Sequence, residues 1–350
     1  TPNNQILIDK LDDELISYVY RNKYINMNEE KEEQKKEEKD QKEKINKMPS
    51  MEVMKTLCHL KMYNNLMSDD YKELMGDNDY LPEYPGSVKF ELRDHIAIIT
   101  FGIPEGKKVA ALSYDVFMSM NAIFDKIKMD DQVWGVILTG QDRCFVAGAD
   151  LSDKRMQSAN FSGPDTLIRV RKHIVHDSFM RVLNCERPVL AAINGHCLGG
   201  GAELASCCDF RIASSAVKHI GYPEIELGGI PAYLGVTQVM RIMRPSYAKE
   251  MLMTGKHYCA KEALDMGFVD YVVEPEEFME YCFNYMKSMT KNAPLALKYC
   301  KICADRSQEM PYEAASQMEC IIAALLAGTE DGVEGKAARR EKRPPVWKNR

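Results

Sequence analysis

From residue 88 onward, short apolar segments alternate with segments whose apolar residues recur at helical spacing. The apolar segments 96–101, 133–139, 189–194 and 210–213 predict buried strands, and the periodic segments 116–127, 167–182 and 204–208 predict helices. Ser113 is a suitable N-cap for the first of these helices. This alternation predicts an α/β fold.

Beyond Pro231 the pattern becomes largely helical. Helical periodicity recurs over 236–243, 248–253, 261–266, 276–289, 295–304 and 312–327, and only 269–273 has the character of a strand. No period of 20 to 50 residues repeats along the chain, which argues against a solenoid or a propeller. We therefore expect a core over residues 86–272 and a helical region over 273–350.

The first 85 residues differ from the rest of the chain in composition and pattern, which predicts an N-terminal extension. Residues 29–47 contain eight acidic residues and seven lysines but no apolar stripe, so they are expected to form a solvated helix or a flexible linker. Apolar residues at helical spacing on either side, within 6–19 and 51–75, predict two short helices. Pro82, Pro85 and Gly86 mark the predicted boundary with the core.

Composition excludes several classes of protein. The formal net charge of −6 gives no basic field for nucleic acid or anionic lipid, and no window approaches the roughly 18 apolar residues of a membrane span. Residues 1–10 have no signal-peptide pattern, so we expect a cytoplasmic protein, although an upstream targeting segment stays open because the chain starts at Thr1. The 11 cysteines are expected to be reduced, and the isolated pair Cys300 and Cys303 is a weak candidate for a metal or redox site.

The most informative motif contains three consecutive glycines, 199–201, between a predicted buried strand and a predicted helix. It is not a dinucleotide fingerprint, because Leu204 occupies the position of the third glycine. The sequence also lacks GxSxG, HExxH and GxxxxGK[ST] motifs. Main-chain N–H groups at such a turn are suited to negative charge on a ligand oxygen, and Glu203 lies one turn into the helix.

Two further segments are expected near this turn. Residues 144–150 form a second turn rich in small residues, which would provide a second N–H donor if the two strands are neighbours. Residues 221–224 add a second carboxylate, Glu224. Two converging donors are what an oxyanion hole for a thioester needs.

In this order and spacing, the segments resemble those of the crotonase (enoyl-CoA hydratase/isomerase) superfamily. The matching pieces are residues 137–140, 145–150, 191–209, 223–225, 228–231 and 341–346, and the resemblance covers about three quarters of the chain. It implies a spiral of ββα turns with a helical C-terminal trimerisation region, assembled as a homotrimer or a dimer of trimers.

The resemblance also implies roles for individual residues. The N–H groups of Ala149 and Gly200 would hold the thioester oxygen, and Glu203 and Glu224 would be the catalytic carboxylates of a hydratase. Residues Ala147, Ala149, Asp150, Leu151, Ser152 and Gly200 would line the acyl-CoA site. The implied activity is hydration of a 2-enoyl-CoA, with no cofactor beyond the CoA of the substrate and no metal. Double-bond isomerisation and a noncatalytic acyl-CoA-binding subunit are the alternatives.

Some positions depart from the family pattern or add candidates. Ser152 stands where hydratases often have lysine, and Tyr233 adds bulk near the expected acyl pocket, either as a wall or as a catalytic group. His173 and His176 lie three apart on a predicted helix and are further acid/base candidates.

Overall fold

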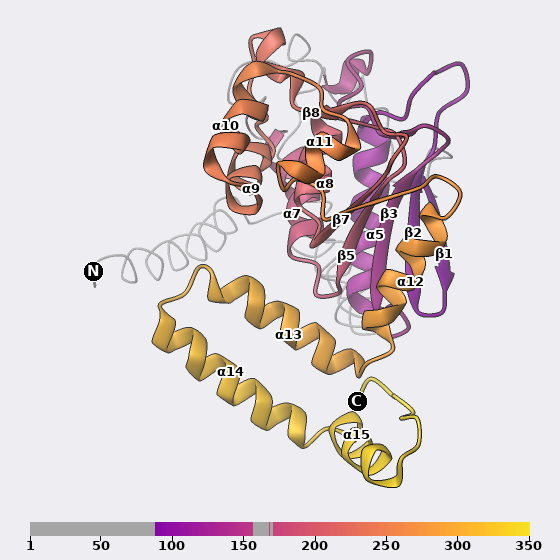
Figure 1. The fold of residues 1–350 in the computed structure, drawn as a ribbon, viewed down its shortest axis with the longest axis vertical. Helices are drawn as coiled ribbons and strands as arrows, with labels where there is room; N and C mark the ends of the chain where they lie inside the picture. Colours follow the sequence, from indigo (N-terminus) through magenta and orange to yellow (C-terminus); the bar gives the residue numbers. More distant parts are fainter. Residues whose placement is uncertain (1–87, 157–167, 169–170) are drawn as a thin grey trace, which may run out of the picture. The chain divides into compact units, whose positions relative to one another are not determined.

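The computed structural model describes residues 88–156, 168 and 171–350. The predicted N-terminal helices and the charged segment 29–47 lie outside these residues. Within the described part, the elements alternate as predicted and then become helical (Figure 1). No helix among the described residues is both long enough and apolar enough to cross a membrane.

A six-stranded sheet forms the centre of the fold. Its strand order is β1-β2-β3-β5-β7-β9, and only β1 runs antiparallel to its neighbour. The strands are β1 (Val88–Arg93), β2 (Ile96–Phe101), β3 (Gly135–Gly140), β5 (Val189–Ile193), β7 (Phe210–Ser214) and β9 (Tyr271–Val273). β3 and β5 are almost continuously apolar because both are central in the sheet and buried on both faces.

Helices cover this sheet. Phe278, Phe283 and Met286 of α12 (Phe278–Thr290) pack against Ile96, Ile137 and their neighbours in the sheet. Because alternate strand side chains point to opposite faces, the buried Ala97 and Ile99 face the other side. α5 (Tyr114–Met129) begins at Ser113, whose side chain accepts a hydrogen bond from the Val116 N–H at 3.4 Å, as the sequence predicts.

A second, smaller sheet was not predicted from the sequence. It consists of β4 (Cys144–Val146), β6 (His196–Leu198) and β8 (Ile220–Gly221), all parallel, in the order β4-β6-β8. Strands of two or three residues are too short to show a period of two, so hydrophobic periodicity does not reveal them.

The remaining helices are mostly where the sequence places them. They are α8 (Gly200–Ser206), α9 (Gly235–Ile242), α10 (Pro245–Thr254), α11 (Ala260–Asp265), α13 (Pro294–Ser307), α14 (Tyr312–Ala327) and α15 (Glu330–Glu341). The helix expected over 167–182 is instead a π-helix, η3 (Arg171–His176), followed by α7 (Asp177–Leu183), and its start falls among residues that are not described. π-Helical turns are often found at functional sites.

The C-terminal helices leave much apolar surface uncovered. α13 and α14 lie side by side in Figure 1, yet Ala315 is the one buried residue of α14. Ile321 and Leu325 of that helix are 61% and 68% exposed. Cys300 is exposed on α13, whereas Cys197, Cys207 and Cys208 are buried.

Candidate active site

The three strands of the small sheet each lead into one of the predicted site segments. β4 ends at Val146 and continues to Ala149, β6 ends at Leu198 and continues to Gly200, and β8 leads to Glu224. Because the strands are parallel neighbours, their carboxyl ends lie at one edge of the sheet. This topology brings together Ala149, Gly200 and Glu224, which are 51 and 24 positions apart in the chain.

The N–H groups of Ala149 and Gly200 lie near each other at this edge. A Cβ placed on Gly200 would be 3.7 Å from the Ala149 nitrogen. The backbone of Leu112 pairs with the flanking residues, donating to Gly148 O at 2.8 Å and accepting from Asp150 N at 3.0 Å, so the Ala149 N–H points away from that pairing. Neither N–H has a protein acceptor among the described residues.

Gly199 and Gly201 are each required to be glycine, for different structural reasons. A Cβ on Gly201 would lie 2.0 Å from Val146 O, so β4 can approach α8 only at a glycine. Gly199 has a φ of +52°, a region that side chains disfavour. A Cβ on Gly199 would also lie 2.7 Å from Glu224 Oε1.

Glu203 is buried on α8 and is held by the backbone of the segment that begins α9. Its Oε1 accepts a hydrogen bond from the Tyr233 N–H at 2.7 Å, and the Gly235 N–H also donates to this carboxyl group. Burial raises the pKa of Glu203 to about 8, the two N–H groups oppose that rise, and the charge of Glu224 adds to it. Glu203 is therefore mostly protonated at neutral pH in the unliganded site.

Glu224 lies in the first turn of a short 3₁₀-helix, η4 (Pro223–Leu227). Its Oε2 is buried without a hydrogen-bond partner among the described residues. Burial raises the pKa of this carboxyl group too. A buried carboxylate oxygen that lacks a protein partner is available to a water molecule or a ligand.

An aromatic wall adjoins the carboxylates. The Tyr233 ring stacks on that of Phe179 from α7, with centroids 6.2 Å apart and planes 5° apart, and Phe179 also contacts Phe117 from α5. Burial raises the pKa of Tyr233, opposed by the charge of Arg171. The pocket-wall interpretation of Tyr233 stays a prediction.

His173 and His176 point to a neighbouring carboxylate. Their Nδ1 atoms lie 3.4 and 3.5 Å from the Asp177 carboxylate oxygens. Among the described residues, neither ring hydrogen-bonds to Glu203 or Glu224. The same part of the chain has no cluster of three or more His, Cys, Asp or Glu that is arranged to hold a metal ion.

A cation that was not predicted from the sequence lies beside the turn that follows Ala149. Lys107 Nζ donates to Ser152 Oγ at 2.8 Å and lies 3.9 Å from Asp150 Oδ2. Ser152 also donates to the Asp150 carboxylate, and Leu151 between them is 72% exposed. The positive charge of Lys107, 45 residues upstream, therefore lies beside Ser152, the position at which the related hydratases often have a lysine.

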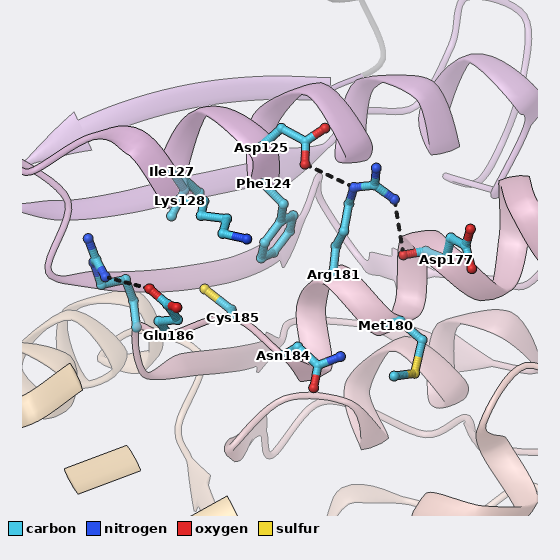
Figure 2. Close-up of a pocket in the computed structure, with 11 residues that line it drawn as sticks. Phe124, Asp125, Ile127, Lys128, Asp177, Met180, Arg181, Asn184, Cys185 and Glu186 are labelled. Carbon is cyan, nitrogen blue, oxygen red and sulfur yellow. Dashed lines mark hydrogen bonds and ion pairs between the residues drawn. The ribbon is translucent and has the colours of Figure 1, made fainter. Parts of the chain in front are cut away.

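A cavity of about 370 Å³ lies elsewhere, between α5 and α7 (Figure 2). Arg181 crosses it to Asp125 at 3.1 Å, and Met180 and Cys185 also line it. Phe179 faces Tyr233 whereas Met180 and Arg181 line the cavity, so the cavity lies on another face of α7. None of the predicted site residues lines it.

Known proteins match the same part of the chain that contains this candidate site. Residues 91–350 match the family model described as enoyl-CoA hydratase/isomerase. A short-chain-enoyl-CoA hydratase from Clostridium acetobutylicum is 34% identical over 260 residues, which cover 73% of this chain and 95% of that protein. A crotonyl-CoA hydratase from Syntrophomonas wolfei is 33% identical over 258 residues, with coverages of 73% and 96%.

Solved structures agree with the sequence matches. An enoyl-CoA hydratase from Bacillus anthracis superposes with a TM-score of 0.69 at 28% identity, and the match covers 75% of this chain and all of that one. This similarity confirms the predicted crotonase fold over the core and the helical C-terminal region. Residues 1–87 lie outside the described structure.

Proposed function

Because the chain belongs to the enoyl-CoA hydratase/isomerase family, we propose that it catalyses the reversible hydration of a 2-enoyl-CoA to a 3-hydroxyacyl-CoA. The observation that carries this proposal is the placement of two carboxyl groups, the buried Glu203 and the half-buried Glu224, beside two N–H groups that have no protein acceptor in the described chain. Hydration needs these two kinds of group, because it moves two protons and develops negative charge on one oxygen.

In the proposed reaction, Ala149 and Gly200 hold the thioester oxygen. Their N–H groups donate to it as the electrons of the C2–C3 double bond move onto the conjugated carbonyl. Removing one such donor typically costs about 10²- to 10³-fold in kcat. Both donors here come from the main chain, and main-chain donors need little rearrangement when the charge appears.

Glu203 and Glu224 are the proposed proton-transfer groups. Burial raises both pKa values and two adjacent negative charges repel, so the pair is expected to hold one proton near neutral pH. The ionised carboxylate takes a proton from water as the water oxygen bonds to C3, and the protonated carboxyl group delivers its proton to C2. The unpartnered Glu224 Oε2 is a suitable contact for that water.

The CoA portion is proposed to lie along Ala147, Ala149, Asp150, Leu151, Ser152 and Gly200, with Lys107 providing a positive charge toward its phosphates. The exposed Leu151 offers apolar contact. No cofactor beyond the CoA of the substrate enters this scheme.

Double-bond isomerisation is the second candidate, since it uses the same oxyanion contacts. It transfers a proton between two carbons and needs only one carboxylate. The presence of two carboxyl groups with raised pKa values at this edge of the sheet, one buried and one half-buried, favours hydration.

A panel of enoyl-CoA thioesters tests the assignment. We expect 2-enoyl-CoAs to lose their conjugated absorbance with formation of the 3-hydroxyacyl-CoA. A gain of conjugated absorbance from 3-enoyl-CoAs, with no 3-hydroxyacyl product, would support isomerisation. Acyl-CoA binding without turnover of either class would support a noncatalytic binding subunit.

We also propose a homotrimer or a dimer of trimers, as the family resemblance implies. The support from this chain is α14, whose Ile321 and Leu325 are exposed although the helix is strongly apolar. Another copy of the chain is a suitable cover for this face. Light scattering coupled to size-exclusion chromatography measures the mass of the assembly.

A further inference from the structure

Two N–H groups that hold Glu203 flank a residue in a strained conformation. Leu234 has a φ of +70°, in the left-handed region that bulky residues rarely adopt. Tyr233 and Gly235 on either side of it both donate to the Glu203 carboxyl group. The orientation of these donors therefore depends on contacts that keep the turn in place.

Gly235 cannot anchor this turn through a side chain. A Cβ there would lie 2.6 Å from Pro231 Cβ and 2.8 Å from Glu203 Oε1, so the position accommodates only glycine. The ring of Tyr233 does anchor it. That ring stacks in parallel on Phe179, which is fully buried on α7 and packs further against Phe117.

We propose that Phe179 is a positioning residue for Glu203, acting through the ring of Tyr233 and the Tyr233 N–H. The chain of contacts runs from the core side of α7 to the Tyr233 ring, and from the Tyr233 main chain to Glu203 Oε1 at 2.7 Å. The importance of this contact for turnover rests on the proposed hydratase function, whereas its effect on Glu203 titration does not.

Four charged or titratable groups interact with Glu203 or with Tyr233. Glu224 from η4 raises the pKa of Glu203. The charge of Glu203 in turn raises the pKa of Cys207, the C-cap of α8, and of the buried Tyr222 beside η4, and the charge of Arg171 from η3 acts on Tyr233. Phe179 carries no charge. A change in Glu203 titration after substitution of Phe179 therefore reports a change in geometry or solvation.

Phe179→Leu tests the proposal, since leucine keeps most of the buried volume but removes the stacked ring. The pKa of Glu203 is obtained from the pH dependence of unfolding, as the difference from the same protein carrying Glu203→Gln. We expect Phe179→Leu to raise this pKa by about 0.5 to 1 unit, because a weaker Tyr233 N–H contact no longer favours the ionised form. This readout does not depend on activity.

Kinetics give the second readout. We expect kcat on the best enoyl-CoA to fall about tenfold while KM changes less than about threefold. The matched control is Phe117→Leu, which removes a ring that contacts Phe179 but not Tyr233. Tyr233→Phe, which keeps both the ring and the N–H, is expected to leave the pKa unchanged.

A double-mutant cycle tests whether Phe179 acts through Tyr233. The combination of Phe179→Leu with Tyr233→Leu is expected to shift the pKa no further than the larger single effect. The proposal would be overturned if the shifts of the Glu203 pKa in the two single variants add up in the double variant. It would also be overturned if Phe179→Leu and Phe117→Leu give the same pKa for Glu203. If Phe179→Leu fails to fold, Phe179→Met provides the same comparison. If Phe179→Leu shifts the pKa of Glu203 as expected but the wild-type protein has no hydratase activity, the proposed function is rejected and the positioning role of Phe179 stands.

Discussion

The carboxylate of Glu224 lies directly over the α-carbon of Gly199, since a Cβ at position 199 would be 2.7 Å from Glu224 Oε1. The N-cap of α8 is thus in contact with the carboxylate that follows β8. Because Gly199 has no side chain, Glu224 Oε1 can lie in the space that a Cβ would occupy.

This relationship predicts the effect of Gly199→Ala. The new methyl group displaces Glu224, so we expect kcat to fall by about 10²-fold or more, in the range of losing a general acid or base. The backbone conformation of Gly199, with φ +52° and ψ −122°, adds a cost of about 1 to 3 kcal/mol for alanine. Gly267→Ala is the control, because Gly267 has a φ of +84° but, among the described residues and apart from its chain neighbours, no atom lies within 4 Å of its Cβ position. Equal losses of activity in both variants would contradict the prediction.

Glu203→Gln and Glu224→Gln are each expected to lower kcat by about 10²- to 10⁴-fold with little change in acyl-CoA binding. Glutamine keeps the size of the side chain but cannot exchange the proton. Stopped-flow turnover and calorimetric binding of a saturated acyl-CoA separate the two effects. Glu226→Gln, on the exposed side of η4, is the matched control. A loss at only one of the two glutamates would favour isomerisation.

Stability is expected to depend on the titration of Glu203. Its pKa is about 8 in the folded chain against an ordinary value of 4.5, so between these values the folded state binds a proton that the unfolded state lacks. Stability from this group is therefore complete below about pH 4.5 and is lost as pH rises toward 8, at roughly 1.4 kcal/mol per pH unit.

The comparison with Glu203→Gln isolates this contribution. Glutamine does not ionise, so the stability of Glu203→Gln relative to wild type is expected to increase from pH 5 to pH 8, as the free energy of unfolding of wild type falls. Denaturant unfolding at several pH values and one fixed protein concentration measures the difference. A difference that does not vary with pH would show that Glu203 has an ordinary pKa.

Lys107→Met is expected to raise KM for crotonyl-CoA several-fold and to leave KM for the crotonyl thioester of N-acetylcysteamine unchanged. The truncated thioester lacks the phosphates toward which the Lys107 charge is proposed to point. Lys108→Met is the control. Adding Ser152→Lys to Lys107→Met restores a cation at the same turn, so KM is expected to recover. An equal effect of Lys107→Met on both thioesters would indicate a structural role.

Local patterns were sufficient to predict the main strands and most helices. The apolar runs of β3 and β5 and the periodic apolar face of α5 are properties of consecutive residues. The glycine run and Glu203 were found because the turn and the carboxylate are close in sequence. α15 was missed because its surface is mostly polar, with little apolar periodicity.

Other parts of the site depend on contacts between distant residues. Lys107 reaches Ser152 across 45 residues, and Tyr233 reaches Glu203 across 30. The left-handed Leu234 offers no signal, because leucine gives no indication of a positive φ. These features follow from tertiary packing, which no local pattern encodes.

The parallel order β4-β6-β8 has a consequence for refolding. Each strand carries one part of the site at its carboxyl end, and each is too short to be stable without its neighbours. Such long-range pairings form late, because loop closure has to precede them. Turnover should therefore return in a refolding experiment only after far-ultraviolet circular dichroism has recovered, and no fragment that lacks one of the three strands should regain it.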